Sequence, residues 1–591
     1  MKKLKLNKSN NSYPWYKFYK DVPEHIEYPK GSMVDVIVQT AFKYPDNIAL
    51  VYYNNKITYR ELADKIIECA KALKGLGIKK GDIVSICMPN TPTAIYMFYA
   101  VNMVGAIANM IHPLSSEKEI EFYLNKTESK AILTIDVDYK KIMNVINNTH
   151  VTKIIVSSAG DDLKGLKKLM YNIFKTDLTK AIKKIKQVFL KAFKNREVIS
   201  YKRFIKRGHL YYEDYGAEVS SSDTAAILYS GGTSGTPKGI MLSNYNFNVL
   251  AVGANLMCEL SKEGDSVLSI MPIFHGFGLG VCIHAPLRVG MTCFLVPTFK
   301  ASKLIKLIRE SKPNFFVGVP TLFEALYNSS GIKPGDFSSI NCIVSGGDTM
   351  DEENYKKYND MFKKYGSTAK IRVGYGLTEA TAATCLSPTE MHKPGSIGVP
   401  FPDNIYKIVK IGTTKEVKPM EDGEICICGP TVMQGYLNEP EETAETLKKH
   451  NDGKVWLHTG DIGCMDNDGF VYFKSRLKRI IISSGYNIYP SYIETVINKH
   501  EYVSSSTVIG VPDQYRGEIA KAFIVLKKEV KLTDEVEEEI KEYCERHIAK
   551  YSMPRIFEFR RELPKTLVGK VAYTVLEKEE KIKDKVKKDD N

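Results

Sequence analysis

Residues 229–239 read YSGGTSGTPKG, and this stretch limits the possible fold of the chain more than any other. It contains four glycines, four Ser or Thr hydroxyls, a proline and one lysine. Ordered glycine loses more backbone entropy than other residues, and proline lacks an N–H donor, so the stretch is unsuited to a helix or strand interior. The apolar run 225–228 (AAIL) before it is typical of a strand. We therefore predict a loop at a strand end.

The composition of this loop is typical of a phosphate-binding site. Glycines let backbone N–H groups approach an anion, hydroxyls supply further donors, and Lys238 adds a positive charge. A flexible Gly/Ser surface loop is the alternative, which the ordered Thr-Pro-Lys-Gly ending disfavours. A Walker-type loop needs Ser or Thr after Gly-Lys, whereas Pro237 precedes this lysine and Gly239 follows it. The predicted phosphate ligands are Ser230, Gly231, Gly232, Thr233, Ser234, Gly235, Thr236 and Lys238.

Further motifs follow the loop, and their order resembles that of the adenylate-forming (AMP-binding) superfamily, in its acyl-CoA synthetase and fatty-acid–CoA ligase branch. These motifs are 271–278 (MPIFHGFG), 343–350 (IVSGGDTM), 374–380 (GYGLTEA), 456–461 (WLHTGD), 475–480 (SRLKRI), 485–490 (GYNIYP) and 564–570 (PKTLVGK). The resemblance extends over about residues 35–575.

The resemblance implies roles for residues within these motifs. His275 would line the acyl site, Glu379 would bind Mg²⁺, and Lys570 would be the catalytic lysine. A carboxylate beside phosphate oxygens suits a hard cation, and the aromatic face of Tyr375 suits adenine. Asp461 would accept hydrogen bonds from the ribose hydroxyls. The other predicted nucleotide and coenzyme A contacts are Gly347, Asp348, Gly376, Thr378, Arg476, Lys478 and Gly485.

The chain departs from the family pattern at a few positions. Asp348 stands where many relatives have a small apolar residue, and Ser475 stands where they have Gly or Asp. Residues 274–277 (FHGF) replace the Phe-Asp-x-Ser pattern with which the peptide-synthetase branch holds an amino group. Amino-acid activation is therefore disfavoured, and the apolar surroundings suit an alkyl or aryl acid better.

Strands that alternate with helices in the first part of the chain predict an α/β fold with largely parallel sheets. At 591 residues the chain exceeds a single core. The resemblance implies a large N-terminal domain with several subdomains at 1–477 and a small mobile α+β domain at 478–575, which would rotate about Lys478. The nearly all-charged residues 577–591 suggest a tail from about 576, either frayed helix or disordered.

Composition indicates an ordinary globular protein in a reducing compartment. Apolar residues make up 43% and charged residues 26%. The eleven cysteines show no CxxC and no metal-ligand spacing, so reduced thiols in the cytoplasm are the simplest interpretation. The basic start MKKLKLNKSNN has no hydrophobic region behind it, and a secretory signal is not expected. The uncharged stretch 83–116 is interrupted by polar residues and prolines, which predicts a buried helix followed by a buried strand.

Residues 164–196 form a basic insertion with eleven basic residues and one acid, a net +10 of the chain's +14. Ile182, Ile185, Phe189 and Phe193 recur there at helical spacing. Such a helix can lie on an anionic membrane surface, here the inner membrane surface, or pack on its own domain with a solvated lysine face. The rest of the chain carries only +4, so no nucleic-acid partner is expected. The sequence leaves the oligomeric state open.

The implied reaction has two steps and uses ATP, Mg²⁺ and coenzyme A. A carboxylic acid would attack the α-phosphate of ATP, giving acyl-AMP and pyrophosphate, and coenzyme A would then take the acyl group. Thr233, Lys238 and Lys570 would stabilise charge on the phosphates, mainly by electrostatic positioning. We predict a medium- or long-chain fatty acid as the substrate. An aryl or branched acid, or an acyl carrier protein as acceptor, is the alternative, and a non-enzymatic nucleotide-binding scaffold is disfavoured because the chemical residues are present.

Overall fold

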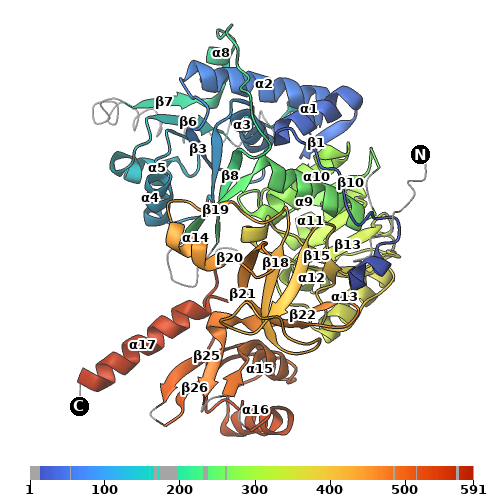
Figure 1. The fold of residues 1–591 in the computed structure, drawn as a ribbon, viewed down its shortest axis with the longest axis vertical. Coiled ribbons are helices and arrows are strands. Elements are labelled where there is room, and N and C mark those ends of the chain that lie inside the picture. The colour runs from blue at the N-terminus through green and yellow to red at the C-terminus, as the bar shows by residue number, and fades with distance from the viewer. Residues whose placement is uncertain are drawn as a thin grey trace.

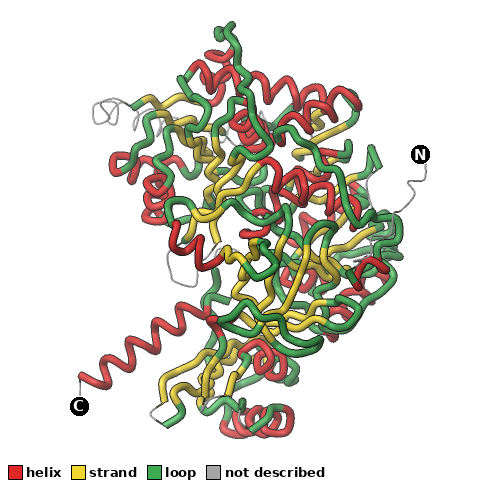
Figure 2. Tube along the Cα trace, in the orientation of Figure 1, coloured by secondary structure: helices red, strands yellow, loops and turns green. Residues whose placement is uncertain are grey.

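The computed structural model describes residues 13–53, 55–158, 160–165, 171, 196–230, 237–259, 262–483, 486–513, 515–550, 552–566 and 571–589. These residues form two large sheets, a smaller antiparallel sheet and a separate C-terminal sheet (Figure 1). Figure 2 shows the strands in the interior of the main body and many of the helices at its margins. Across the described residues, every helix is too short or too polar to serve as a bilayer-spanning segment.

The first large sheet carries the predicted phosphate loop. Its strands are parallel from β8 to β7, whereas β9 and β19 add antiparallel pairs at one edge. In spatial order the strands are β19 (Gly435–Tyr436), β9 (Lys238–Ser243), β8 (Thr224–Ser230), β4 (Ile107–Ile111), β3 (Ile83–Cys87), β5 (Ala131–Ile135), β6 (Lys153–Ser157) and β7 (Glu197–Ser200).

The second large sheet carries the adenine-side motifs and is parallel through its centre. Its order is β16 (Val399–Pro400), β15 (Cys385–Leu386), β14 (Ile371–Tyr375), β13 (Cys342–Ser345), β12 (Phe315–Gly318), β10 (Ser266–Ser269), β11 (Thr292–Leu295), β1 (Ile48–Tyr52) and β2 (Asn55–Thr58). The carboxyl ends of parallel strands meet at one edge, so the turns after β13 and β14 lie side by side.

Two antiparallel-rich sheets complete the molecule. The third sheet contains β17 (Ile405–Val409), β18 (Gly423–Cys428), β20 (Leu447–Lys449), β21 (Val455–Met465) and β22 (Val471–Arg476). The C-terminal sheet contains β23 (Ile481–Ser483), β24 (Tyr486–Ile488), β25 (Val503–Asp513), β26 (Gly517–Leu526) and β27 (Ile556–Phe559). Helices α15 (Pro490–Ile497), α16 (Asp534–His547) and α17 (Tyr573–Asp589) belong to this part (Figure 1).

Local sequence explains several of these elements. The Thr58 hydroxyl accepts a hydrogen bond from the Glu61 N–H while the Glu61 carboxylate caps Thr58, and this capping box opens α2 (Tyr59–Gly75). Within 83–116, α3 (Pro92–Met103) is buried over 92–102 and β4 follows it. The predicted buried helix and buried strand are confirmed. All eleven cysteines are unpaired, as expected.

The charged C-terminus forms a helix that packs in part on the C-terminal domain. Of the two forms left open, the structure has the helix, which begins at Tyr573 and therefore crosses the expected limit at 575. Leu576 is buried in a small cluster with Val511 and Phe523, and Glu580 pairs with Lys521 at 2.8 Å. The start of α17 is thus part of the C-terminal domain, while its far end projects away from the sheet (Figure 1).

Candidate active site

The phosphate loop joins two strands of a hairpin. Strands β8 and β9 are antiparallel, and Ser230 lies opposite Lys238 at the base of the loop. Tyr229 anchors this base, because its hydroxyl donates to Asn109 Oδ1 at 2.8 Å and its ring packs 4.2 Å from that of Tyr123. The predicted strand end is thus present, but the loop is shorter than expected, because Tyr229 and Ser230 belong to β8 and Lys238 and Gly239 belong to β9. Six of the predicted ligands, Gly231, Gly232, Thr233, Ser234, Gly235 and Thr236, lie outside the described residues.

Lys238 and Glu379 are brought together by Tyr436. The Lys238 Nζ lies 4.8 Å from the centre of the Tyr436 ring, and the Tyr436 hydroxyl donates to Glu379 Oε1 at 3.2 Å. Tyr436 reaches this position because β19 pairs with β9, which begins at Lys238. The lysine predicted to bind phosphate and the carboxylate predicted to bind a cation thus both contact the side chain of Tyr436. Sequence reasoning gave Tyr436 no role, although its aromatic side chain beside Gly435 was visible.

Glu379 lies on a tight turn with a strained backbone. The turn η4 (Thr378–Ala380) is followed by Thr381 and Ala382, whose φ angles of 53° and 78° lie in the left-handed region. Gly376 is required here, because a Cβ at that position would lie 1.4 Å from the Ala382 carbonyl oxygen. The close approach of these two backbone segments fixes Thr378 and Glu379 at the end of β14.

The buried carboxylate of Asp461 contacts the half-buried Tyr375 and the exposed Arg476. The Tyr375 hydroxyl donates to Asp461 Oδ2 at 2.6 Å, and Arg476 Nε lies 2.9 Å from Oδ1. Asp461 is fully buried, and the arginine lies directly opposite it in the β21–β22 pair. Burial raises the pKa of the Asp461 carboxyl, whereas the Arg476 charge and the Tyr375 hydrogen bond oppose that rise. The contact with Arg476 is an ion pair without hydrogen-bond alignment, so Oδ1 keeps accepting capacity.

The predicted adenine segment lies beside these three residues. It follows β13, which is parallel to β14. Gly347 has φ 79°, and Asp348 is exposed, with its Oδ1 accepting from the Thr349 N–H at 2.9 Å. The Asp348 carboxylate is therefore turned toward its own backbone and solvent.

The His275 segment reaches the same region from the other side. A Cβ at Gly276 would lie 3.2 Å from that of Ala382 and 3.5 Å from Leu228 Cδ1, so this segment adjoins both β8 and the Glu379 turn. The Phe277 N–H donates to His275 Nδ1 at 3.2 Å, which orients the ring. Phe274 packs against the ring of His112 at 4.0 Å. The helical stretch η3 (Phe277–His284) continues from this segment and is buried over 278–284.

The joint between the two domains contains three basic residues in four positions. Arg476 pairs with Asp461 of the large domain, whereas Arg479 forms an ion pair with Glu494 and lies 4.6 Å from the centre of the Tyr573 ring, both in the C-terminal domain. Lys478 lies between them in η5 (Leu477–Arg479) and is exposed. Arg479 is a second residue that sequence reasoning missed, and only its position within the SRLKRI motif pointed to it.

Two further predicted site residues, Gly485 and Lys570, lie outside the described residues, but the residues on either side of them are described. Residues 484–485 connect β23 to β24, where Ser483 pairs with Tyr486. Lys565 forms a β-bridge with Val571. The two bridged residues lie on either side of residues 567–570, and the chain continues from Val571 to Tyr573, next to Arg479.

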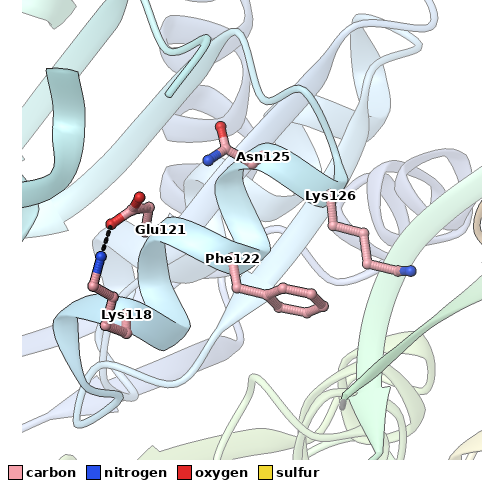
Figure 3. Close-up of a pocket in the computed structure, with 5 residues that line it drawn as sticks. All are labelled: Lys118, Glu121, Phe122, Asn125 and Lys126. Atoms are coloured by element: carbon pink, nitrogen blue, oxygen red, sulfur yellow. Dashed lines mark hydrogen bonds and ion pairs between the residues drawn. The ribbon is translucent and has the colours of Figure 1, made fainter. Parts of the chain in front are cut away.

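A surface hollow lies on α4 (Glu117–Lys126), apart from these groups. Figure 3 shows its lining by five residues of this one helix. Lys118 pairs with Glu121 at 3.2 Å, and Lys126 forms an ion pair with Glu439. The charged side chains of this hollow thus form ion pairs. All of its lining residues come from one helix, whereas the region around Asp461 and Glu379 contains side chains from several elements.

Known proteins resemble this chain over nearly its whole length. A family model described as AMP-binding enzyme matches residues 37–437, and one described as AMP-binding enzyme C-terminal domain matches residues 492–570. The long-chain-fatty-acid–CoA ligase of Bacillus subtilis (strain 168) is 34% identical over 572 residues, covering 96% of this chain and 98% of that protein.

Solved structures show the same fold. An ATP-bound RpMatB–BxBclM chimera has a TM-score of 0.79 at 23% identity, with 93% of this chain and 98% of the other covered. The o-succinylbenzoate CoA synthetase from Bacillus subtilis, in complex with its acyl-adenylate intermediate, has a TM-score of 0.75 at 26% identity, with 93% and 98% covered.

The fold and the convergence of these motifs define an adenylate-forming acid–CoA ligase, a class whose substrates include ATP and coenzyme A. The chain belongs to the AMP-binding enzyme family. The predicted family and the predicted fold class, α/β with a large N-terminal and a small C-terminal domain, are confirmed.

Proposed function

We propose that this enzyme activates a medium- or long-chain fatty acid as acyl-AMP and transfers the acyl group to coenzyme A. The observation that carries the choice of acid is the apolar setting of the His275 segment. Leu228 and Ala382 lie beside Gly276, and Phe274 packs against the ring of His112. The name of the Bacillus subtilis relative, a long-chain-fatty-acid–CoA ligase, supports the same class of acid. An aryl or branched acid, and an acyl carrier protein as acceptor, are the alternatives.

In the first step a carboxylate oxygen of the acid attacks the α-phosphorus of ATP, and the bond from that phosphorus to the bridging oxygen breaks. Pyrophosphate leaves, and negative charge increases on the phosphate oxygens. We assign the stabilisation of that charge to Lys238, the loop 231–236 and Lys570. We assign adenine to the Tyr375 ring and the ribose to Asp461, whose Oδ1 is able to accept another hydrogen bond.

The residues around Glu379 fit a Mg²⁺ ion. The Glu379 Oε1 faces the Tyr436 hydroxyl on the ring over which Lys238 lies, and Mg²⁺ favours carboxylate oxygens next to phosphate oxygens. When bound by Glu379, Mg²⁺ would neutralise part of the charge on the phosphates. Tyr436 would hold the carboxylate in place for it.

In the second step we propose that the domain 478–575 rotates about Lys478, so that the Lys570 loop leaves and coenzyme A reaches the acyl carbonyl. The thiol sulfur attacks that carbonyl, the bond to AMP breaks, and the thiol proton is lost. The exposed Lys478, between one arginine held by each domain, supports this site of rotation.

Pyrophosphate release in the presence of ATP and Mg²⁺, with a panel of fatty, aryl and amino acids, tests the proposal. We expect release with fatty acids, and a thioester only when coenzyme A is added. Release with aryl acids alone would keep the reaction and replace the substrate. The absence of release with every acid, from a protein that binds ATP, would overturn the proposed activity.

We also propose that the basic insertion 164–196 attaches the enzyme to an anionic membrane surface, on the basis of its net +10 charge. Most of this insertion lies outside the described residues. Co-sedimentation with vesicles that contain an anionic lipid tests the proposal. A variant that lacks 164–196 is expected to lose binding, and equal binding by this variant would contradict it.

A further inference from the structure

A second group of chemically active side chains lies in the third sheet, outside the residues assigned to ATP and the acid. Cys426 on β18 lies directly opposite His458 on β21 in the antiparallel pair. The turn after β20 brings His450 to the same place. The backbone N–H of His450 donates to the Lys454 carbonyl at 3.0 Å and closes this turn. One ligand atom from each of the three residues lies within 4.8 Å of the others. Cys426 is 0%, His450 5% and His458 8% exposed.

The His458 imidazole has the surroundings of a metal ligand, and the His450 ring faces it through Nε2. His458 Nδ1 lies 2.7 Å from Glu424 Oε2, so the carboxylate accepts the Nδ1 proton and leaves the Nε2 lone pair directed away from it. The His458 Nε2 lies 2.9 Å from the His450 Nε2. A carboxylate behind a ligating histidine is the usual second layer of a metal site, because it fixes the tautomer and the ring orientation.

Without a metal ion, the two Nε2 atoms are satisfied only if one of them carries a proton and donates it to the other. A metal ion would accept both Nε2 lone pairs at once in place of that hydrogen bond, and the Cys426 sulfur lies within reach as a third ligand. In the described part of the chain the His450 Nδ1 is buried and has no hydrogen-bond partner, and a metal bound at Nε2 leaves that nitrogen as it is.

We propose that Cys426, His450 and His458 bind one divalent transition-metal ion of the Zn²⁺ class, with Glu424 as the positioning residue for His458. One sulfur and two imidazole nitrogens suit Zn²⁺ and Co²⁺, whereas Mg²⁺ and Ca²⁺ favour oxygen ligands. Binding converts the Cys426 thiol to a thiolate and releases its proton to water, with no change of oxidation state. The exposed turn 451–454 gives the ion a path from solvent and a water for the fourth coordination position.

The site would join three segments that support the ribose-binding strand. Cys426 belongs to β18, His450 to the turn, and His458 lies three residues before Asp461 on β21. The Glu424 Oε1 also accepts from the Gly460 N–H at 3.0 Å. A bound ion would therefore stabilise this part of the sheet and hold the segment next to Asp461, and its role would be structural.

Metal titration of the full chain, stripped with a chelator and kept free of ATP and Mg²⁺, tests the proposal. We expect one equivalent of Co²⁺ to give near-ultraviolet thiolate-to-metal absorption, displacement of Co²⁺ by Zn²⁺, and a higher Tm with Zn²⁺. Cys426→Ser should lose that absorption. Cys428→Ser, which changes the next thiol along the same strand, should keep it. His450→Gln and Glu424→Gln are each expected to weaken Zn²⁺ binding by about 10-fold or more.

Three results would overturn the proposal. The first is the absence of thiolate absorption from the wild-type chain at saturating Co²⁺. The second is retention of that absorption by a folded Cys426→Ser variant, which would place the metal elsewhere. If Cys426→Ser does not fold, the third is unchanged Zn²⁺ affinity in both His450→Gln and Glu424→Gln. The measurement uses no ATP or acid, so its outcome is independent of the proposed ligase substrate.

Discussion

Replacement of Tyr436 separates the two contacts that this side chain makes. Tyr436→Phe removes the hydroxyl that donates to Glu379 and keeps the ring beside the Lys238 ammonium. Tyr436→Leu removes both contacts. If Tyr436 positions both Glu379 and Lys238, Tyr436→Phe should raise only the half-saturating Mg²⁺ concentration. Tyr436→Leu should raise both that concentration and the KM for ATP.

The geometry sets the size of each effect. The contact of 3.2 Å lies at the long end for an O–H···O hydrogen bond, so we assign it about 1–1.4 kcal/mol, just below the usual value for a charged acceptor. At about 1.4 kcal/mol per factor of ten, the half-saturating Mg²⁺ concentration should rise about 5- to 10-fold. Loss of a lysine–ring contact worth about 0.5–1 kcal/mol should raise the KM for ATP about 2- to 5-fold in the leucine variant only.

The assay is pyrophosphate release at varied Mg²⁺ with saturating ATP, and at varied ATP with saturating Mg²⁺. Tyr472→Phe is a matched control, because the Tyr472 hydroxyl also donates to a carboxylate at 3.2 Å, that of Asp466, outside the site. An unchanged or lower Mg²⁺ requirement in Tyr436→Phe would refute the reasoning. It would mean that the hydroxyl competes with the ion for Glu379 instead of orienting the carboxylate.

Three further predictions concern other residues. Lys570→Ala should abolish acyl-AMP formation while thioester formation from supplied acyl-AMP persists. Lys565→Ala is the control. Equal loss of both steps would contradict the assignment of Lys570 to the first step alone. Gly376→Ala should lower the unfolding free energy by about 3 kcal/mol in urea denaturation, because its Cβ meets the Ala382 oxygen, and wild-type stability would be the contrary result. Burial lowers the pKa of His284 from 6.5 to about 3, so only the neutral ring suits the fold and stability is lost as pH falls below 6.5. Between about pH 7.5 and about pH 5.5 this loss is about 1.4 kcal/mol, which His284→Gln should remove; the same loss in both proteins would exclude His284 as its source.

Much of the fold could be predicted from local sequence, because its signals are local. The glycine- and hydroxyl-rich stretch at 229–239 is typical of a loop, and the structure has the paired ends of two strands on either side of residues 231–236. The Thr58 capping box and the buried stretch 83–116 also depend on short-range patterns. The C-terminal helix was harder to predict, because the burial of Leu576 and the pairing of Glu580 with Lys521 come only from tertiary packing.

The residues of the candidate site could be predicted only where they belong to a sequence motif. Tyr436 and Arg479 belong to the candidate site through contacts with Lys238 and Tyr573, which are distant in sequence. The motif that contains Arg479 marks its position but does not predict that contact. The spacing of the cysteines indicated no metal site. Cys426, His450 and His458 meet because two strands pair in one register and a turn returns beside them. A ligand set assembled by sheet register has no fixed spacing in the chain.

The two arginines of the joint have a mechanical consequence. Arg476 is fastened to the large domain through Asp461, and Arg479 is fastened to the small one through Glu494 and Tyr573. If the small domain rotates about Lys478 as proposed, torsion at 477–478 would leave both ion pairs intact. The energy barrier to that rotation would then come from the domain surfaces that separate and not from the joint itself.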